Sequence, residues 1–169
     1  MDKTVDDFLK HRDYRVEYQR SLVDIYIKTL VCVRVNYPSL NKENSTTIKI
    51  NEIIRNEIIN FLDDNIIFEN TFISLEGPIS LLVVDENPFR VKEICVDIEE
   101  NHPVGRLVDI DVYDKNYKGI SRIDLGMEKR KCFLCDNLAF VCSRAGKHSW
   151  KEIFNFIENT LNNYLYMLD

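Results

Sequence analysis

Apolar residues recur along this chain at two intervals, and each interval predicts a different kind of element. Recurrence at every third or fourth position predicts helices, which fall at residues 3–29 (one or two helices), 50–61, 88–100 and 150–168. Compact β-branched or alternating runs predict strands, which fall at residues 30–35, 66–75, 79–84 and 105–113. The helix starts are marked by Ser45-Thr46-Thr47 and by Asn87-Pro88, and Glu76-Gly77-Pro78 is expected to close a hairpin.

From residue 30 to residue 113 the predicted order is strand, helix, strand, strand, helix, strand. This is the split βαβ arrangement of ferredoxin-like folds and polymerase-type palms, so we expect an α+β, nucleotidyltransferase-like core after an N-terminal helix. The 169 residues contain no internal repeat and fit one domain. Within it we expect a catalytic core at about 30–125, then a Cys-containing segment and a closing helix at about 130–169.

Charge is distributed unevenly along the chain, whose net charge is −6. Residues 118–151 carry eight basic and three acidic side chains, a local charge of +5, whereas the other residues sum to −11. An acidic chain with few aromatic residues in its basic segment disfavours nucleic-acid binding. The basic segment therefore predicts contact with some other anion.

The composition favours a cytoplasmic protein with no membrane partner. The first residues are acidic and lack the basic and apolar regions of a secretion signal. No run approaches the roughly 18 to 20 apolar residues of a membrane span. The five cysteines are an odd number, which makes a disulfide framework a poor interpretation and a reducing compartment the better one.

The run from Gly105 to Val112 carries two carboxylates that a strand would place on one face. Because side chains alternate along a strand, Asp109 and Asp111 share one face, and Val108, Ile110 and Val112 share the other. Two like charges repel unless a hard cation lies between them, and Mg²⁺ held in this way is typical of phosphoryl and nucleotidyl transfer. The alternative is a solvated acidic face, which an isolated Asp-x-Asp pattern favours.

Basic side chains follow the carboxylates within forty residues and are of the kind that a triphosphate needs. They are Lys118, Arg122, Lys129, Arg130, Lys131, Arg144, Lys147 and His148. Any one of them taken alone is better explained by a solvated basic face. Arg106, at the start of the carboxylate strand, is expected either to brace the Asp pair or to bind a phosphate.

Three cysteines and a histidine in the basic segment have spacings compatible with a metal site. Cys132, Cys135, Cys142 and His148 supply the donors of a tetrahedral structural Zn²⁺ site. The Cys-x-x-Cys spacing is typical of zinc, whereas the later two spacings are not diagnostic. The alternative is that Cys142 packs as an apolar residue in a small helix and that His148 binds an anion.

Read as one string, residues 99–148 resemble the citrate lyase holo-acyl-carrier-protein synthase family, also called apo-citrate lyase phosphoribosyl-dephospho-CoA transferase. The resemblance rests on Arg106-Leu-x-Asp-x-Asp, Arg130-x-Cys-x-x-Cys and Cys142-x-Arg144, and continues more weakly upstream at Asn36-x-Pro38 and Lys42. It implies that a serine hydroxyl of the citrate lyase acyl-carrier subunit attacks the α-phosphorus of 2′-(5″-triphosphoribosyl)-3′-dephospho-CoA. Pyrophosphate then leaves.

For that reaction Asp109 and Asp111 are expected to be catalytic and to hold Mg²⁺ at the triphosphate. The expected substrate contacts are Lys42, Arg106, Arg122, Arg130, Arg144 and His148. The implied partners are the acyl-carrier subunit of citrate lyase and triphosphoribosyl-dephospho-CoA.

Two other functions stay open. One is a metal-dependent phosphohydrolase or nucleotidyltransferase with a small acceptor, which would use the same Asp pair. The other is a non-enzymatic zinc-knuckle binding module, in which the cysteines and His148 matter and the Asp pair does not.

Overall fold

One antiparallel sheet of five strands organises the computed structural model, which describes residues 4–39 and 42–168. The strand order is β2-β3-β1-β4-β5, and the strands are β1 Thr29–Val35, β2 Ile66–Ser74, β3 Gly77–Val84, β4 Val108–Tyr113 and β5 Gly119–Ile120. The helices are α1 Val5–Tyr26, α2 Ser45–Leu62, α3 Pro88–Asn101, α4 Ala139–Ala145 and α5 Trp150–Tyr166. Within the described residues, none of these helices combines the length and apolar character needed to cross a membrane.

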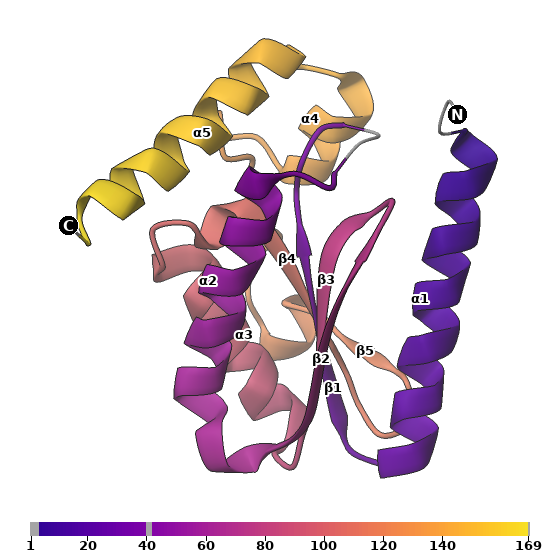
Figure 1. Ribbon diagram of the computed structural model, residues 1–169. Coiled ribbons are helices and arrows are strands. Elements are labelled where there is room, and N and C mark those ends of the chain that lie inside the picture. Colours follow the sequence, from indigo (N-terminus) through magenta and orange to yellow (C-terminus); the bar gives the residue numbers. More distant parts are fainter. Residues whose placement is uncertain (1–3, 40–41, 169) are drawn as a thin grey trace.

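Residues 29–113 confirm the predicted order of elements, which runs β1-α2-β2-β3-α3-β4. β1 lies in the middle of the sheet and pairs antiparallel with β3 on one side and β4 on the other. Each β-α-β unit therefore leaves a gap between its two strands that a strand of the other unit fills. The resulting fold is a mixed α+β arrangement with α1 on one face of the sheet and α2 and α3 on the other (Figure 1).

Alternation along β1 builds an apolar layer on each face of the sheet. Val31 and Val33 face α2 and α3 and belong to the larger core cluster. Leu30 and Cys32 point the opposite way and pack in a second cluster with Leu22 and Val23 of α1. Because both faces are covered, β1 is almost wholly buried along its length.

One expected helix cap and one expected strand start are wrong, while the start at Asn87 is confirmed. Asn87 caps α3, since its Oδ1 accepts from the N–H of Phe89 at 2.9 Å. Asn44, one residue before the expected stretch, caps α2 by accepting from the N–H of Thr47 at 3.0 Å. The strand expected from residue 105 begins only at Val108, because residues 105–107 form a short 3-10 turn.

Gly105 explains that late start. A Cβ at this position would lie 2.0 Å from the carbonyl oxygen of Ile98, so the turn passes directly against the backbone of α3. Only glycine permits this approach. The chain therefore leaves α3, turns against its last residues and enters β4 in one fixed register.

Charged side chains replace a neighbouring strand along part of the outer edge of β4. β5 has two residues and pairs only with the last two residues of β4. Nearer the start of β4, Lys92 donates to the carbonyl of Ile110 at 2.6 Å, and the N–H of Ile110 donates to Glu99 at 2.8 Å. Arg130 donates to the carbonyl of Val108 at 2.7 Å. The backbone polar groups at this edge are thus hydrogen-bonded without a strand.

We expect Gly105→Ala to lower the free energy of unfolding by at least about 2 kcal/mol, because the added Cβ must push the turn away from α3. Urea unfolding followed by circular dichroism measures the change. The matched control is Gly119→Ala, whose Cβ would meet only ring carbons of Tyr113 at 3.8 Å or more and should change stability by less than about 0.5 kcal/mol. Equal effects of the two variants would contradict this account of the turn.

Candidate functional site

A cavity of about 530 Å³ opens between the end of β1, the start of β4 and the segment that leads into α5. Its polar lining includes Asn36, Lys42, Asp109 and Arg130, and the opposite wall carries aromatic side chains and two cysteines. This volume lies within the range that small-molecule ligands occupy. The cavity therefore brings together parts of the chain that are more than a hundred residues apart.

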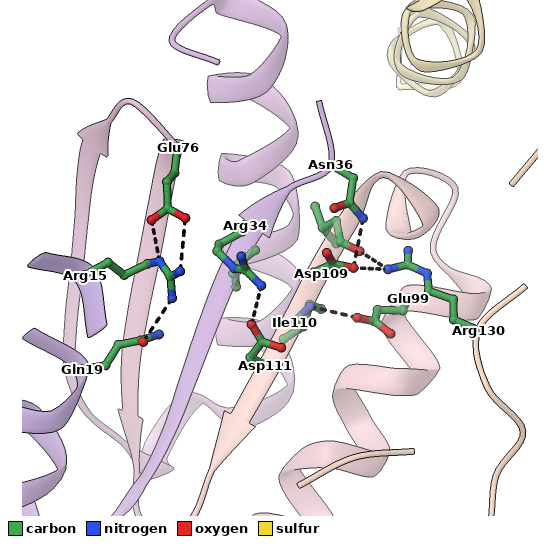
Figure 2. Close-up of polar contacts among 12 residues, drawn as sticks. Arg15, Gln19, Arg34, Asn36, Glu76, Glu99, Asp109, Ile110, Asp111 and Arg130 are labelled. Atoms are coloured by element: carbon green, nitrogen blue, oxygen red, sulfur yellow. Dashed lines mark hydrogen bonds and ion pairs between the residues drawn. The ribbon is translucent and has the colours of Figure 1, made fainter. Parts of the chain in front are cut away.

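Asp109 lines this cavity from β4 and is held there by two donors. Arg130 donates from Nη1 to Oδ1 at 2.5 Å, and Asn36 donates from Nδ2 to the same oxygen at 3.0 Å (Figure 2). The Arg130 guanidinium also donates to the carbonyl of Arg106 at 2.8 Å. A charge-assisted, multiply bonded guanidinium fixes its partner firmly, so Asp109 has a defined orientation.

Asp111 shares the face of Asp109, as the alternation along β4 predicts. Its Oδ2 accepts from Nη2 of Arg34 on β1 at 2.7 Å, and both side chains are about one-third exposed (Figure 2). The expectation that two bare carboxylates repel across this face is therefore wrong, because each carboxylate has its own arginine. An ion pair between side chains of adjacent strands supplies the positive charge that we had expected of a cation alone.

Arg34 is a site residue that the sequence reasoning missed. It is the one charged residue in an otherwise apolar strand that is buried on both faces. Burying a guanidinium is costly unless it is paired, so a lone arginine in such a strand predicts a carboxylate on the neighbouring strand. This signal was available in the sequence.

Lys42 reaches the cavity from the loop between β1 and α2. Gly77 supports that loop, since a Cβ on Gly77 would lie 3.0 Å from both the Cβ and the carbonyl oxygen of Lys42. Burial and the charge of Arg34 lower the pKa of Lys42, although Glu76 and Asp109 act in the opposite direction. An anion bound in the cavity would act in the opposite direction and raise this pKa, so this lysine is suited to phosphate.

A buried ion pair lies beside these groups on the α1 face of the sheet. Arg15 of α1 donates to both carboxylate oxygens of Glu76, from Nε at 2.7 Å and from Nη2 at 3.1 Å (Figure 2). It also donates to Oε1 of Gln19 at 3.2 Å. Both charged side chains are about 6% exposed, so this bidentate geometry is needed to offset their desolvation.

Three of the predicted phosphate contacts are not among the described residues that line the cavity. Arg122 forms ion pairs with Glu99 and Glu100 of α3. The other two are Arg106, which donates to the carbonyl of Lys131 at 2.5 Å, and Arg144, whose guanidinium lies 5.7 Å from the ring centroid of Phe140. Their roles in substrate binding stay predictions, whereas Lys42, Arg130 and His148 do lie at the cavity.

The three cysteines and His148 meet in the opposite wall. One donor atom from each of Cys132, Cys135, Cys142 and His148 lies within 4.8 Å of all the others. Sγ of Cys135 is 3.4 Å from Sγ of Cys142 and 3.4 Å from Nε2 of His148. Cys142 does lie buried in the small helix α4, as the alternative interpretation expected, but its sulfur faces the other thiols.

Comparison with known proteins identifies one family. The family model described as apo-citrate lyase phosphoribosyl-dephospho-CoA transferase matches residues 3–164. Protein CitXG of Leuconostoc mesenteroides subsp. cremoris is 34% identical over 160 residues, which are 92% of this chain and 34% of that protein.

Two further relatives carry the family's name. The apo-citrate lyase phosphoribosyl-dephospho-CoA transferase of Escherichia coli O7:K1 is 35% identical over 91 residues, 54% of this chain and 50% of that protein. A probable apo-citrate lyase phosphoribosyl-dephospho-CoA transferase of Vibrio cholerae serotype O1 is 27% identical over 165 residues, 95% of this chain and 93% of that protein. The matched part of the chain thus spans a third of the first relative, half of the second and nearly all of the third.

We expect Arg122→Ala to lower the free energy of unfolding by about 1–3 kcal/mol, because it leaves the buried carboxylate of Glu99 without its guanidinium. Chemical unfolding measures the loss. Arg144→Ala is the matched control, since Arg144 is exposed and its stacking on Phe140 is worth less than about 1 kcal/mol. If Arg122→Ala kept full stability and lost only affinity for a phosphate ligand, the side chain would serve the substrate instead.

Proposed function

This chain belongs to the apo-citrate lyase phosphoribosyl-dephospho-CoA transferase family, and we propose that it attaches this prosthetic group to the acyl-carrier subunit of citrate lyase. The donor is 2′-(5″-triphosphoribosyl)-3′-dephospho-CoA, and the acceptor is a serine hydroxyl. The observation that carries the proposal is the family match, which extends over residues 3–164 and so includes every residue of the cavity lining.

The proposed reaction is nucleotidyl transfer. The serine oxygen forms a bond to the α-phosphorus, the bond from that phosphorus to the β-phosphate oxygen breaks, and pyrophosphate leaves. One carboxylate of the Asp pair takes up the hydroxyl proton. We include in the proposal a nucleotidyltransferase-like core, which the β1-α2-β2-β3-α3-β4 order and the carboxylates on β4 support.

The Asp pair is suited to hold Mg²⁺ without losing its arginines. The described hydrogen bonds of Asp109 end on Oδ1 and that of Asp111 ends on Oδ2, so each carboxylate has a second oxygen to offer. Carboxylate oxygens on one face match the preference of Mg²⁺ for hard oxygen ligands. When bound, the ion neutralises charge on the transferring phosphate. The chain's own part is to orient both carboxylates through Arg34, Asn36 and Arg130.

Lys42 and Arg34 supply the positive charge that the triphosphate needs. Lys42 lines the cavity, and the neighbouring charge of Arg34 contributes to its lowered pKa. Arg34 donates from Nη2 to Asp111 at 2.7 Å and so holds its positive charge next to the Asp pair. Fixed donors and charges of this kind stabilise the leaving pyrophosphate at little cost in reorganisation.

The exposed basic residues around the cavity are suited to dock the protein substrate. Lys129, Lys131, Arg144, Lys147 and Lys151 are all exposed and belong to the segment of local charge +5. Acyl-carrier proteins are usually acidic, so opposite charges would steer the encounter and make it sensitive to salt.

We expect the intact mass of apo acyl-carrier subunit to rise by one phosphoribosyl-dephospho-CoA group after incubation with this protein, the triphosphate donor and magnesium. Mass spectrometry measures the gain, and a parallel reaction without magnesium tests the need for a cation. Release of phosphate or pyrophosphate with no change in carrier mass would indicate a hydrolase or another acceptor. No change in either would favour a binding module.

We expect Asp109→Asn and Asp111→Asn each to reduce the transfer rate by at least about 100-fold, since each removes charge from the oxygens offered to the cation. The initial rate of carrier modification measures the loss. Each variant also takes the partner from an arginine, which should cost about 1 kcal/mol of stability at these partly exposed sites. Circular dichroism checks that the variants fold.

Asp24→Asn, on an exposed position of α1, is the control for the loss of one negative charge and should leave the rate unchanged. Rates near the wild-type value in both Asp109→Asn and Asp111→Asn would remove the Asp pair from the proposed mechanism while leaving the transfer reaction itself intact.

A further inference from the structure

Residues 126–149 form a wall of the cavity but have almost no apolar core of their own. Cys142 is the single buried residue in this range. The regular structure within it is α4 and one isolated bridge between Lys131 and Leu138. The burial of apolar area is the main source of stability in a fold. A segment with so little buried area therefore needs a different source of stability.

The segment is fixed to the rest of the chain mainly near its start. Arg130 donates to the carbonyl of Val108 on β4, and Arg106 of the preceding turn donates to the carbonyl of Lys131. Phe133 stacks on Phe156 of α5, with ring centroids 4.9 Å apart. These contacts do not reach α4 or the stretch from Gly146 to Ser149, which both follow the Cys-x-x-Cys pair.

The thiols and the imidazole converge at the place where those contacts end. Zinc at about 2.3 Å from sulfur and about 2.0 Å from nitrogen, in a tetrahedron, separates its ligand atoms by about 3.5–3.8 Å. The two 3.4 Å separations from Sγ of Cys135 are within a few tenths of an ångström of that range, and all four donors lie within 4.8 Å of one another. Small rotations of these side chains would complete the tetrahedron.

The backbone around the first two cysteines is arranged to support sulfur ligands. The N–H of Leu134 donates to Sγ of Cys132 at 3.5 Å, and the N–H of Cys132 itself donates to the carbonyl of Asn137 at 2.7 Å. Nζ of Lys147 lies 3.5 Å from Sγ of Cys135. Donors to the sulfur atoms and a nearby cation offset the net negative charge of a site with three thiolates.

We propose that Cys132, Cys135, Cys142 and His148 bind one structural Zn²⁺ ion. Three soft thiolates and an imidazole select zinc over magnesium or calcium, and four protein ligands leave no open position for catalysis. The ion joins the Cys-x-x-Cys turn, α4 and the start of α5, and so fixes the cavity wall that faces Asp109. The site follows from the donors alone and does not require the proposed transfer reaction.

A disulfide between Cys135 and Cys142 is the competing use of the same atoms, because their sulfurs are 3.4 Å apart. It would use neither Cys132 nor His148. A zinc site accounts for the convergence of all four donors. Because only the zinc site needs His148, replacing His148 distinguishes a zinc site from a disulfide.

The full chain, purified without chelator, is expected to contain about one zinc per molecule by plasma mass spectrometry. Replacing the metal with Co²⁺ should give the visible absorption of a tetrahedral, thiolate-ligated site. Removing zinc with a chelator should expose residues 126–149 to limited proteolysis while the sheet stays intact. All three readouts are independent of transfer activity.

The zinc content of substituted chains tests which residues bind the ion. Cys135→Ser and His148→Asn should each retain less than about a tenth of the wild-type zinc. The matched controls, Cys95→Ala and His11→Asn, remove the same donor types elsewhere and should retain all of it. Because Cys135→Ser could fail to fold, the cobalt titration of the unmutated chain tests the site independently.

Three results would overturn the proposal. They are a wild-type chain that gains neither zinc nor cobalt when supplied with them, equal zinc loss in the control variants, and a Cys135–Cys142 disulfide in metal-free protein purified without oxygen. A chain that binds zinc but does not modify the carrier would reject the proposed function and leave the zinc site standing.

Discussion

The position of both candidate carboxylates depends on how the outer edge of β4 is hydrogen-bonded. A full strand does not cover this edge, so charged side chains from α3 and from residue 130 pair with its backbone. Lys92 and Glu99 are nearly fully buried for this purpose, which is costly unless each charge has a partner. Arg130 bonds to this backbone and to Asp109 at once. The same guanidinium therefore sets the strand edge and the orientation of a site residue.

Periodicity along the chain predicts the central fold because its strands and helices are long enough to show their spacing. This periodicity predicts the order of elements over residues 29–113 and the hairpin that β2 and β3 form. The predicted strand is too long at Gly105, where the chain turns against α3 and the adjacent apolar residues Leu107 and Val108 interrupt the alternation. The spacing of apolar residues also does not show that Asn44, rather than Ser45, caps α2. Several neighbouring polar residues can cap a helix, and the backbone angles decide between them. Such choices depend on tertiary contacts that local patterns do not contain.

At the candidate site, too, the sequence predicts local relations between residues but not tertiary contacts. Alternation places Asp109 and Asp111 on one face, and short spacing brings Cys132 and Cys135 together, because both relations are local. The arginine partners are not local, since Arg34 precedes Asp111 by more than seventy residues. The basic segment looks uniform in the sequence, yet Arg130 reaches the cavity while Arg122 pairs with α3. A run of like charges gives a net field, but only the fold assigns each charge its partner.

The central place of β1 also determines the order in which the molecule can assemble. β2 and β3 are joined by a short turn and can pair early, since closing a small loop is fast. β1 must instead find partners 45–55 residues away in β3 and 73–83 residues away in β4. Closing loops of this length costs more conformational entropy than closing the hairpin, so we expect the strand that carries Arg34 to enter the sheet after β2 and β3 have paired. Asp111 acquires its arginine only in that step, and an incompletely folded chain therefore has no working cavity.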